Sequence, residues 1–427
     1  MAIDTPGDTG RAGPGRSATT PAGPFDSALR ARAAAVVPGG MYGHQSARSL
    51  PAAFPQFMAR GEGCHVWDVD GNAYVDLMCS YGPIILGHRH PVVEAAAARQ
   101  AALADCSNGP AEVMVELAEL LVATVADADW AMFAKNGTDA TTACVTIARA
   151  GTGRRKVLVA KGAYHGAAPW CTPVRAGVVA DDRAHLVRYR YNDVDSLTEA
   201  VAACAGDLAA VVVSPFRHDA RFDQELVDPA FASAVRAACD ATGAALVVDD
   251  VRAGFRLASG GSWEPLGIRA DLSAWSKAIA NGHALAAVTG ADHWRDAASS
   301  VYVTGSFWFS AVAMAAAVAT IGELAAVDGV GRMRRAGTRL CDGLAAQAAA
   351  HGVEVRVSGP PQMPFMTFAG DEGFAMADLW SGTAAAGGAY LHPWHNWFVS
   401  AAHTDDDIDR ALLATDDGFA AVRRAFG

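Results

Sequence analysis

The chain has 427 residues, 52% hydrophobic and 19% charged, so it can bury large cores in two or more domains. Its net charge of −11 at pH 7 argues against a nucleic-acid or anionic-membrane partner, because either would need a basic surface. The eight cysteines occur singly, without a C-x-x-C pair, which argues against a disulfide framework and favours a reducing cytoplasm. No apolar stretch reaches the roughly 18 residues of a membrane span.

The N-terminal part of the sequence predicts a tail followed by a hairpin. Residues 1–24 are rich in Gly, Pro, Thr and Ala and lack the apolar core of a secretory signal, so we expect a flexible tail. Residues 25–85 are expected to contribute to a small domain. Within them, strand-like runs flank Asp70-Gly71, a dipeptide that suits a tight hairpin turn. The acidic residues there also suit a calcium loop, but the downstream glutamate of that motif is missing, which favours the hairpin.

Helical patterns alternate with short apolar runs from about residue 90, which predicts an α/β fold with a largely parallel sheet in a large domain over 86–325. The predicted strands are 130–133, 156–160, 208–213, 246–248, 272–275 and 285–289. After an Ala-rich helix at 311–326 the pattern changes. Residues 326–427 are expected to form a smaller α+β domain with strands at 353–357, 364–368 and 397–400.

Two residues of opposite charge follow two of the predicted strands. Asp249 comes directly after the apolar run 244–248, and Lys277 closely follows the strand at 272–275. Ligands of open α/β sheets collect at the carboxyl ends of the strands. A carboxylate and an amine at that edge suit a cofactor with a cationic ring nitrogen and an aldehyde, and pyridoxal phosphate has both. The pair therefore predicts that Lys277 forms a Schiff base with this cofactor.

The strand that begins at residue 130 leads into Asn136, Gly137 and Thr138, ahead of a helix expected over 141–149. Gly137 lets the backbone approach a ligand, and the N–H groups of the first helical turn, with the Thr138 hydroxyl, would form an anion site. The alternative is a helix cap made of Asn, Thr and Asp, which is a common arrangement. Both interpretations stay open at this point.

Two further strand ends carry candidate residues. Tyr164 follows the strand at 156–160 and can stack on a planar ring or pack against the core. Arg217 follows the strand at 208–213 and can grip a carboxylate bidentately or form an ordinary surface ion pair. Each signal is weak, but all fall on successive strand ends of one sheet edge, together with Asp249 and Lys277. This shared edge favours a single site.

From Pro38 to the C-terminus the chain resembles the class III pyridoxal-phosphate aminotransferases, and most of all the branch around glutamate-1-semialdehyde aminomutase. The motifs are Pro38-Gly-Gly40, Trp67-Asp-Val-Asp-Gly-Asn-Ala-Tyr-Val-Asp76, Leu86-Gly-His-Arg-His-Pro91, Gly137-Thr-Asp-Ala140, Tyr164-His-Gly166, Asp249-Asp-Val-Arg-Ala-Gly-Phe-Arg256, Lys277 and Ala401-Ala-His-Thr404. The resemblance implies the aspartate aminotransferase-like fold (fold type I), with pyridoxal phosphate as cofactor. It also implies ping-pong transfer between an amino acid or amine donor and a carbonyl acceptor, in a homodimer with the active site at the interface.

The resemblance also implies a role for each matching residue. Lys277 would be the Schiff-base lysine and proton shuttle, and Asp249 the partner of the ring nitrogen. The other cofactor-binding positions are Tyr164 and Val251 on the two ring faces, His165 in the same motif as Tyr164, Gly137 and Thr138 on the phosphate, Asn136 beside them, and Ser306, whose hydroxyl would reach the phosphate of the neighbouring subunit.

Departures from the family pattern bear on the substrate. The aminomutase's carboxylate-binding arginine should fall close to Ser46, and only Arg48 is nearby, which speaks against the aminomutase's own substrate. Bulky aromatic residues, namely Phe307, Trp308, Trp394 and Trp397, suggest a wide pocket for a bulky or aromatic substrate, although structural roles suit them equally well. By position alone, the hypotheses for substrate contacts are Arg217, Arg48, Trp308 and His395.

Three rival functions remain. An aminomutase or an amino-acid racemase shares the cofactor and differs only in where the proton and nitrogen end. A zinc-binding hydrolase would use histidines such as His88 and His90, or His392, His395 and His403. No acidic helix motif accompanies the C-terminal histidines, so no metal site is expected.

Overall fold

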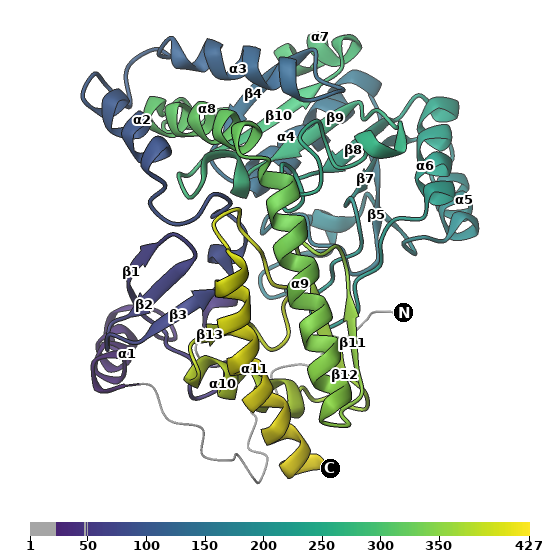
Figure 1. Cartoon of the computed structure of the whole chain (residues 1–427). Coiled ribbons are helices and arrows are strands. Elements are labelled where there is room, and N and C mark those ends of the chain that lie inside the picture. The colour runs from purple at the N-terminus through teal and green to yellow at the C-terminus, as the bar shows by residue number, and fades with distance from the viewer. Residues whose placement is uncertain (1–22, 47, 49) are drawn as a thin grey trace.

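The computed structural model describes residues 23–46, 48 and 50–427. Figure 1 shows a part that carries the large sheet above a part built from small sheets and the long helices α9 and α11. Most of the predicted tail, residues 1–22, lies outside the described residues. The last residue of that tail, Pro24, instead begins helix α1 (Pro24–Val36).

The large sheet has seven strands. In spatial order they are β4 (Trp130–Ala134), β10 (Ala286–Gly290), β9 (Leu272–Trp275), β8 (Ala245–Asp249), β7 (Leu208–Val213), β5 (Lys156–Ala160) and β6 (Leu186–Tyr189). Strand β10 is antiparallel to β4 and β9, and the other neighbouring pairs are parallel. This confirms the predicted largely parallel sheet. Strand β6 was not predicted, because its short sequence contains the charged residue Arg188. In the structure this strand is only partly buried.

Helices cover both faces of this sheet, which explains why the strands are continuous apolar runs. Along β7, Ala210 and Val212 belong to one core cluster and Val211 and Val213 to another on the opposite face. The helices beside the first cluster are α4 (Gly137–Thr152) and α7 (Arg295–Ser300). Those on the opposite face are α2 (Pro91–Ala101), α3 (Val113–Thr124), α5 (Val194–Ala203), α6 (Pro229–Thr242) and α8 (Ala311–Ala326).

The remaining elements form the lower part of Figure 1. They are the sheet β1 (Met58–Glu62), β2 (His65–Asp68), β3 (Ala73–Asp76) and β13 (Ala389–Tyr390), the pair β11 (Val355–Ser358) and β12 (Phe365–Phe368), and helices α9 (Gly329–Ala350), α10 (Ala375–Ala386) and α11 (Asp405–Phe426). The predicted hairpin at Asp70-Gly71 is confirmed by the antiparallel pairing of β2 and β3. Asp68 accepts backbone hydrogen bonds from Asp70 and Asn72, so the turn itself employs this acidic side chain.

The predicted strand at 397–400 is wrong. This segment has no regular secondary structure, and its backbone N–H groups donate to separate stretches of chain. Trp397 donates to the carbonyl of Pro364, Phe398 to that of Leu77, and Val399 to that of Gln362. Because no single partner strand runs alongside it, no ladder forms.

A shared core supports the proposed domain division. Val75 and Leu77 from the N-terminal segment pack in one cluster with Leu340, Trp380 and Phe419. We therefore propose that residues 25–85 and 326–427 build one small domain against the large domain at 86–325. By length and hydropathy, no single helix within the described part of the chain could span a membrane, whereas α8 and α9, bent by 68°, pass that test as a pair.

We predict that the contact between α9 and the loop before β12 tolerates no side chain at Gly337. A Cβ there would lie 1.9 Å from the carbonyl oxygen of Pro361. Gly337→Ala should lower the free energy of unfolding, measured with denaturant, by about 1–3 kcal/mol. Gly322 of α8 is the matched control, because it is exposed and nothing lies within 4 Å of its added Cβ. Gly322→Ala should raise stability by about 0.5–1 kcal/mol. Equal stability of the two variants would contradict the proposed contact.

Candidate active site

The carboxyl ends of the large sheet open onto a cavity of about 340 Å³. Its walls come from the loops after β4, β5, β7, β8 and β9, as expected for an α/β sheet. Every predicted cofactor residue except Ser306 lines it: Asn136, Gly137, Thr138, Tyr164, His165, Asp249, Val251 and Lys277. The cavity is also lined by His218, Arg252 and His283, which were not predicted as site residues.

Lys277 begins a short 3-10 turn directly after β9 and Ser276, with a positive φ of 44° that is unusual for a residue with a side chain. Its Nζ donates a hydrogen bond to the backbone carbonyl of Tyr81 at 2.8 Å. Loss of water around the amine, together with the positive charges of Arg252 and Arg256 and against the opposing charge of Asp249, lowers the pKa of Lys277 to about 7. Near neutral pH, much of this amine is therefore uncharged and nucleophilic.

Asp249 is the last residue of β8 and is 6% exposed. Its Oδ2 lies 2.6 Å from Nδ1 of His165, and its Oδ1 accepts a hydrogen bond from the backbone N–H of Val251 at 3.2 Å. These contacts fix the orientation of the carboxylate at the cavity wall. A buried carboxylate in this position suits a cationic ring nitrogen.

The first turn of α4 faces the cavity. Asn136 is the N-cap, and it forms a reciprocal capping box with Asp139, so the predicted helix cap is present. The helix begins at Gly137, four residues earlier than predicted. Gly137 and Thr138 still line the cavity, and the positive end of a 16-residue helix favours an anion there. The cap and the anion site therefore coexist.

The close packing around this turn requires glycine at two positions. A Cβ at Gly137 would lie 2.6 Å from Cγ1 of Val251, and one at Gly166 would lie 2.6 Å from Oγ1 of Thr138. Tyr164 and Val251 also line the cavity. An amine, a fixed carboxylate, an anion-binding helix end and an aromatic ring are the groups that pyridoxal phosphate requires, so the residues present fit this cofactor.

Arg252 and His218 are cavity residues that the sequence reasoning missed. Nη1 of Arg252 donates to Oδ1 of Asn396 at 2.6 Å and to the backbone carbonyl of His218 at 3.3 Å. Burial lowers the pKa of Arg252 to about 10, which leaves it charged at neutral pH. Burial and the charge of Arg252 hold the pKa of His218 well below its usual value, so its ring is neutral. The sequence signal that could have identified Arg252 was its position as a basic residue three positions after Asp249.

The two arginines proposed as substrate contacts lie outside the cavity wall. Arg217 forms ion pairs with Asp219, at 3.0 Å, and with Glu225. Arg48 is exposed, and its guanidinium carbon lies 3.5 Å from the position of a Cβ on Gly39. The structure therefore does not bring either charge to Lys277.

The other predicted residues lie at different distances from the site. The His395 ring is 5.1 Å from that of Tyr81, whose carbonyl binds Lys277, so His395 lies close behind the cavity. Trp308 packs against the core of the large sheet and covers Gly305. Ser306 is exposed in the loop that precedes α8. Trp397 is 1% exposed and stacks on Trp380, which is a structural position.

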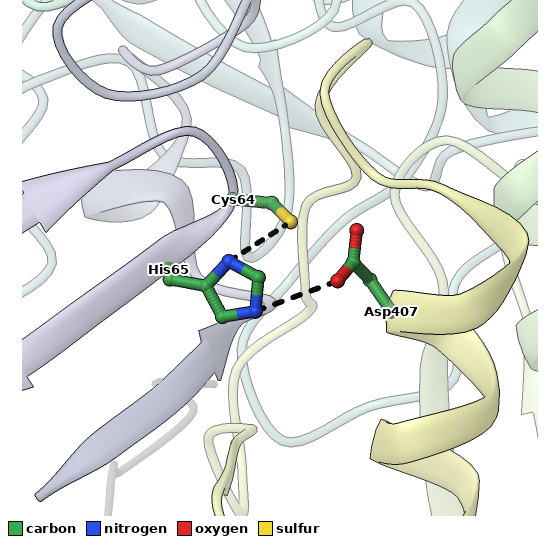
Figure 2. A group of neighbouring side chains, drawn as sticks. All are labelled: Cys64, His65 and Asp407. Carbon is green, nitrogen blue, oxygen red and sulfur yellow. Dashed lines mark hydrogen bonds and ion pairs between the residues drawn. The ribbon is translucent and has the colours of Figure 1, made fainter.

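One group of described residues has ligand atoms close enough to share a metal ion, and it differs from the predicted histidine sets. It consists of Cys64, His65 and Asp407, shown in Figure 2. The Cys64 Sγ lies 3.6 Å from His65 Nδ1, and His65 Nε2 lies 3.4 Å from Asp407 Oδ1. Asp407 also caps α11 through Thr404, and burial with the nearby Asp407 raises the pKa of the Cys64 thiol. These contacts link the start of β2 to the N-terminus of α11.

Comparison with known proteins gives a consistent result. The family profile Aminotransferase class-III matches residues 46–363. The chain is 52% identical over 398 residues to the aminopentol aminotransferase of Sphingopyxis macrogoltabida, covering 93% of this chain and 94% of that protein. It is 32% identical over 425 aligned positions to the glutamate-1-semialdehyde 2,1-aminomutase of Chloroflexus aggregans, covering 91% and 96%.

A solved structure shares both fold and sequence with the chain. The FumI protein of Sphingopyxis sp. MTA144, in its PLP internal aldimine form, superposes with a TM-score of 0.94 at 51% identity, covering 95% of this chain and 98% of FumI. This confirms the predicted fold and cofactor. The chain belongs to the class III aminotransferases and is a pyridoxal-phosphate-dependent aminotransferase.

Proposed function

We propose that this enzyme takes the amino group from a bulky, hydroxyl-bearing amine and passes it to a carbonyl acceptor in two half-reactions. The observation that carries the proposal is the 52% identity to the aminopentol aminotransferase over 93% of this chain. The aminomutase is a more distant relative, at 32% identity. This difference favours transfer between two substrates over an internal aminomutase or a racemase.

Neutral rings near Lys277 support a hydroxyl-bearing donor that carries no anionic group. The Tyr81 ring lies 4.4 Å from that of His44 and 5.1 Å from that of His395. Burial lowers the pKa of both histidines, and the charges of Lys277 and Arg252 lower them further. A neutral imidazole both donates and accepts hydrogen bonds, as a hydroxyl does.

Different residues of the cavity wall would bind different parts of the cofactor. In this proposal, Gly137 and Thr138 bind the phosphate, Asp249 keeps the ring nitrogen protonated, and Tyr164 and Val251 pack on the ring faces. His165 holds Asp249 in place through the 2.6 Å contact. When bound, pyridoxal phosphate supplies an aldehyde that captures an amine and a ring that withdraws electrons from the neighbouring carbon.

Lys277 moves the proton. With the donor amine bound in place of its own, Nζ of Lys277 would be free to accept the proton from the donor's Cα and to hold it for return. An amine with an ordinary pKa of 10.5 would be protonated and unable to accept it. The lowered pKa, about 7, makes the neutral form available.

A homodimer is part of the proposal. The segment around Ser306 exposes large apolar side chains: Tyr302 is 93% exposed, Phe307 64% and Phe309 42%. Aromatic side chains gathered on one exposed segment are typical of a protein interface. A second copy of the chain that covers this segment would bring Ser306 to the phosphate site of its partner.

All eight cysteines are free, which supports our proposal of a reducing, cytoplasmic location.

The two half-reactions test the proposed function. With a bulky amine that carries several hydroxyl groups, the visible band of the lysine-bound cofactor should disappear as the aminated cofactor forms, and a carbonyl acceptor should restore it. Lys277→Ala should slow proton transfer by about 10²–10⁴-fold, because it removes the acid–base group. Lys161→Ala is the control, since Lys161 is an exposed lysine outside the cavity wall. Unchanged rates in Lys277→Ala would contradict the role of Lys277.

The pH dependence of covalent capture tests the state of the Lys277 amine. Because its pKa is lowered to about 7 from 10.5, the neutral amine predominates above pH 7 and is lost as the pH falls below it. The initial rate at which the cofactor-free enzyme captures pyridoxal phosphate, trapped with borohydride and counted on the Lys277 peptide, should rise with a midpoint near pH 7. A midpoint near pH 10 would show an ordinary, solvated lysine.

The dimer makes a separate prediction. Phe307→Glu should shift the protein toward monomers in sedimentation velocity and speed the loss of pyridoxal phosphate, because charge at an apolar interface opposes association. Ser306→Ala should leave the dimer intact and speed cofactor loss alone. A wild-type protein that sediments as a monomer at all concentrations would refute the dimer.

A further inference from the structure

Cys64, His65 and Asp407 bring three kinds of metal-binding atom together outside the wall of the cofactor cavity (Figure 2). A thiol sulfur, a ring nitrogen and a carboxylate oxygen from these residues all lie within 4.8 Å of one another. Cys64 and Asp407 are each 5% exposed, whereas the His65 side chain is 27% exposed. The two buried ligand atoms therefore lie behind an imidazole that water can reach.

Regular secondary structure fixes the positions of these side chains. Cys64 and His65 lie at the start of β2, the strand that pairs with β1 on one side and with β3 on the other. Asp407 lies in the first turn of α11, and the next residue, Ile408, is fully buried in the core cluster beneath that helix. Strands and helices hold ligand atoms more precisely than loops do. The cluster thus joins two rigid elements from opposite ends of the chain.

The two oxygens of Asp407 have different partners. Oδ2 accepts hydrogen bonds from the hydroxyl of Thr404 at 2.6 Å and from the backbone N–H of Thr404 at 3.1 Å. Oδ1 lies 3.4 Å from Nε2 of His65 and 3.6 Å from Nη2 of Arg410, whose side chain is 63% exposed. The helix cap therefore orients the carboxylate with Oδ1 toward His65. Hydrogen bonds of this kind orient the ligands of metal sites in proteins.

The spacing suits a tetrahedral ion. Zinc lies about 2.3 Å from a thiolate sulfur and about 2.0–2.2 Å from an imidazole nitrogen or a carboxylate oxygen, so neighbouring ligand atoms are roughly 3.3–3.6 Å apart. In the cluster, Sγ of Cys64 is 3.6 Å from Nδ1 of His65, and Nε2 of His65 is 3.4 Å from Oδ1 of Asp407. One ion binds only one nitrogen of a ring, so binding requires the partly exposed imidazole to turn.

The types of ligand select the metal. Calcium and magnesium are bound by oxygen atoms, whereas a thiolate with an imidazole and a carboxylate is a typical set for zinc. The local charge also favours a cation, because Asp405 and Asp406 precede Asp407 in the first turn of α11. Asp405 and Asp406 are both exposed and add negative charge beside the cluster.

We propose that Cys64, His65 and Asp407 bind a Zn²⁺ ion, with water as the fourth ligand, and that this ion clamps β2 to α11. The proton of the Cys64 thiol passes to solvent as the sulfur–zinc bond forms. The role is structural, since none of the three residues lines the cavity that contains Lys277. The inference is independent of the proposed donor and acceptor.

Zinc binding is measured by isothermal titration calorimetry on the holoenzyme after treatment with a chelator. Cys64→Ser and Asp407→Asn should each weaken binding by at least about 10- to 100-fold, a loss that is typical even for changes in the hydrogen bonds around a metal ligand. Asp406→Asn is the matched control, because this exposed acid belongs to the same helical turn, and it should bind zinc as the wild type does. The visible band of the lysine-bound cofactor reports that each variant is folded.

X-ray absorption at the zinc edge identifies the ligands without any variant. The wild type should show a sulfur at about 2.3 Å and nitrogen or oxygen atoms at about 2.0–2.2 Å. Zinc at 100 times its dissociation constant should also raise the ratio of folded to unfolded wild-type protein about 100-fold, and at that concentration it should have a much smaller effect on Cys64→Ser.

Three results would overturn the zinc site: a wild-type protein that binds no zinc, a bound ion without a sulfur ligand, or equal zinc affinity in the wild type and Cys64→Ser. None of them bears on transamination, because the measurements use neither the donor nor the acceptor. If Cys64→Ser fails to fold, the sulfur ligand in the wild type still decides the matter.

Discussion

The chemistry of this enzyme depends on keeping the Lys277 amine out of water and without an ion-pair partner. Within the described structure, the one hydrogen bond of Nζ goes to the Tyr81 carbonyl, a neutral acceptor. Asp249 is the nearby acid, and His165 already binds it at 2.6 Å. With Arg252 and Arg256 close by, the charged form of the lysine is disfavoured. A carboxylate at hydrogen-bonding distance from Nζ would reverse this balance.

The fold maintains this arrangement by joining its two parts around the amine. Lys277 lies just after β9 of the large sheet, whereas Tyr81 belongs to the N-terminal segment and packs against the cluster that contains Leu340 and Trp380. Arg256, fully buried, binds carbonyls from the loop after Tyr81 and from Val399 near the C-terminus. The hydrogen bonds that its guanidinium donates to these backbone carbonyls therefore fix the position of the loop after Tyr81. The lysine environment is a product of three distant stretches of chain.

The parts of the site that could be predicted are those that one strand and its following loop determine. Apolar runs mark the strand ends, and the residues that follow them, Asp249 and Lys277, meet because parallel strands share an edge. The sequence could not predict whether a charged side chain would meet a partner of opposite charge. Arg217 and Arg252 both follow strands. Arg217 forms ion pairs with Asp219 and Glu225, whereas the hydrogen bonds of Arg252 to described residues go to Asn396 and the His218 carbonyl, which only the folded chain shows. Strand pairing also depends on distant parts of the chain. The segment 397–400 therefore has a strand-like sequence although no described strand pairs with it. The role proposed for Ser306 depends on a second subunit, which a single sequence does not place.

Following the amino nitrogen tests the central claim that this enzyme joins two substrates through one aminated cofactor. The enzyme would be incubated with a ¹⁵N-labelled amine that carries several hydroxyl groups and with unlabelled pyruvate, and the products analysed by mass spectrometry. The account predicts that each carbonyl product formed from the donor is matched by one ¹⁵N-alanine. Label that stays in a rearranged or racemised donor while pyruvate is not consumed would contradict it and identify an aminomutase or a racemase.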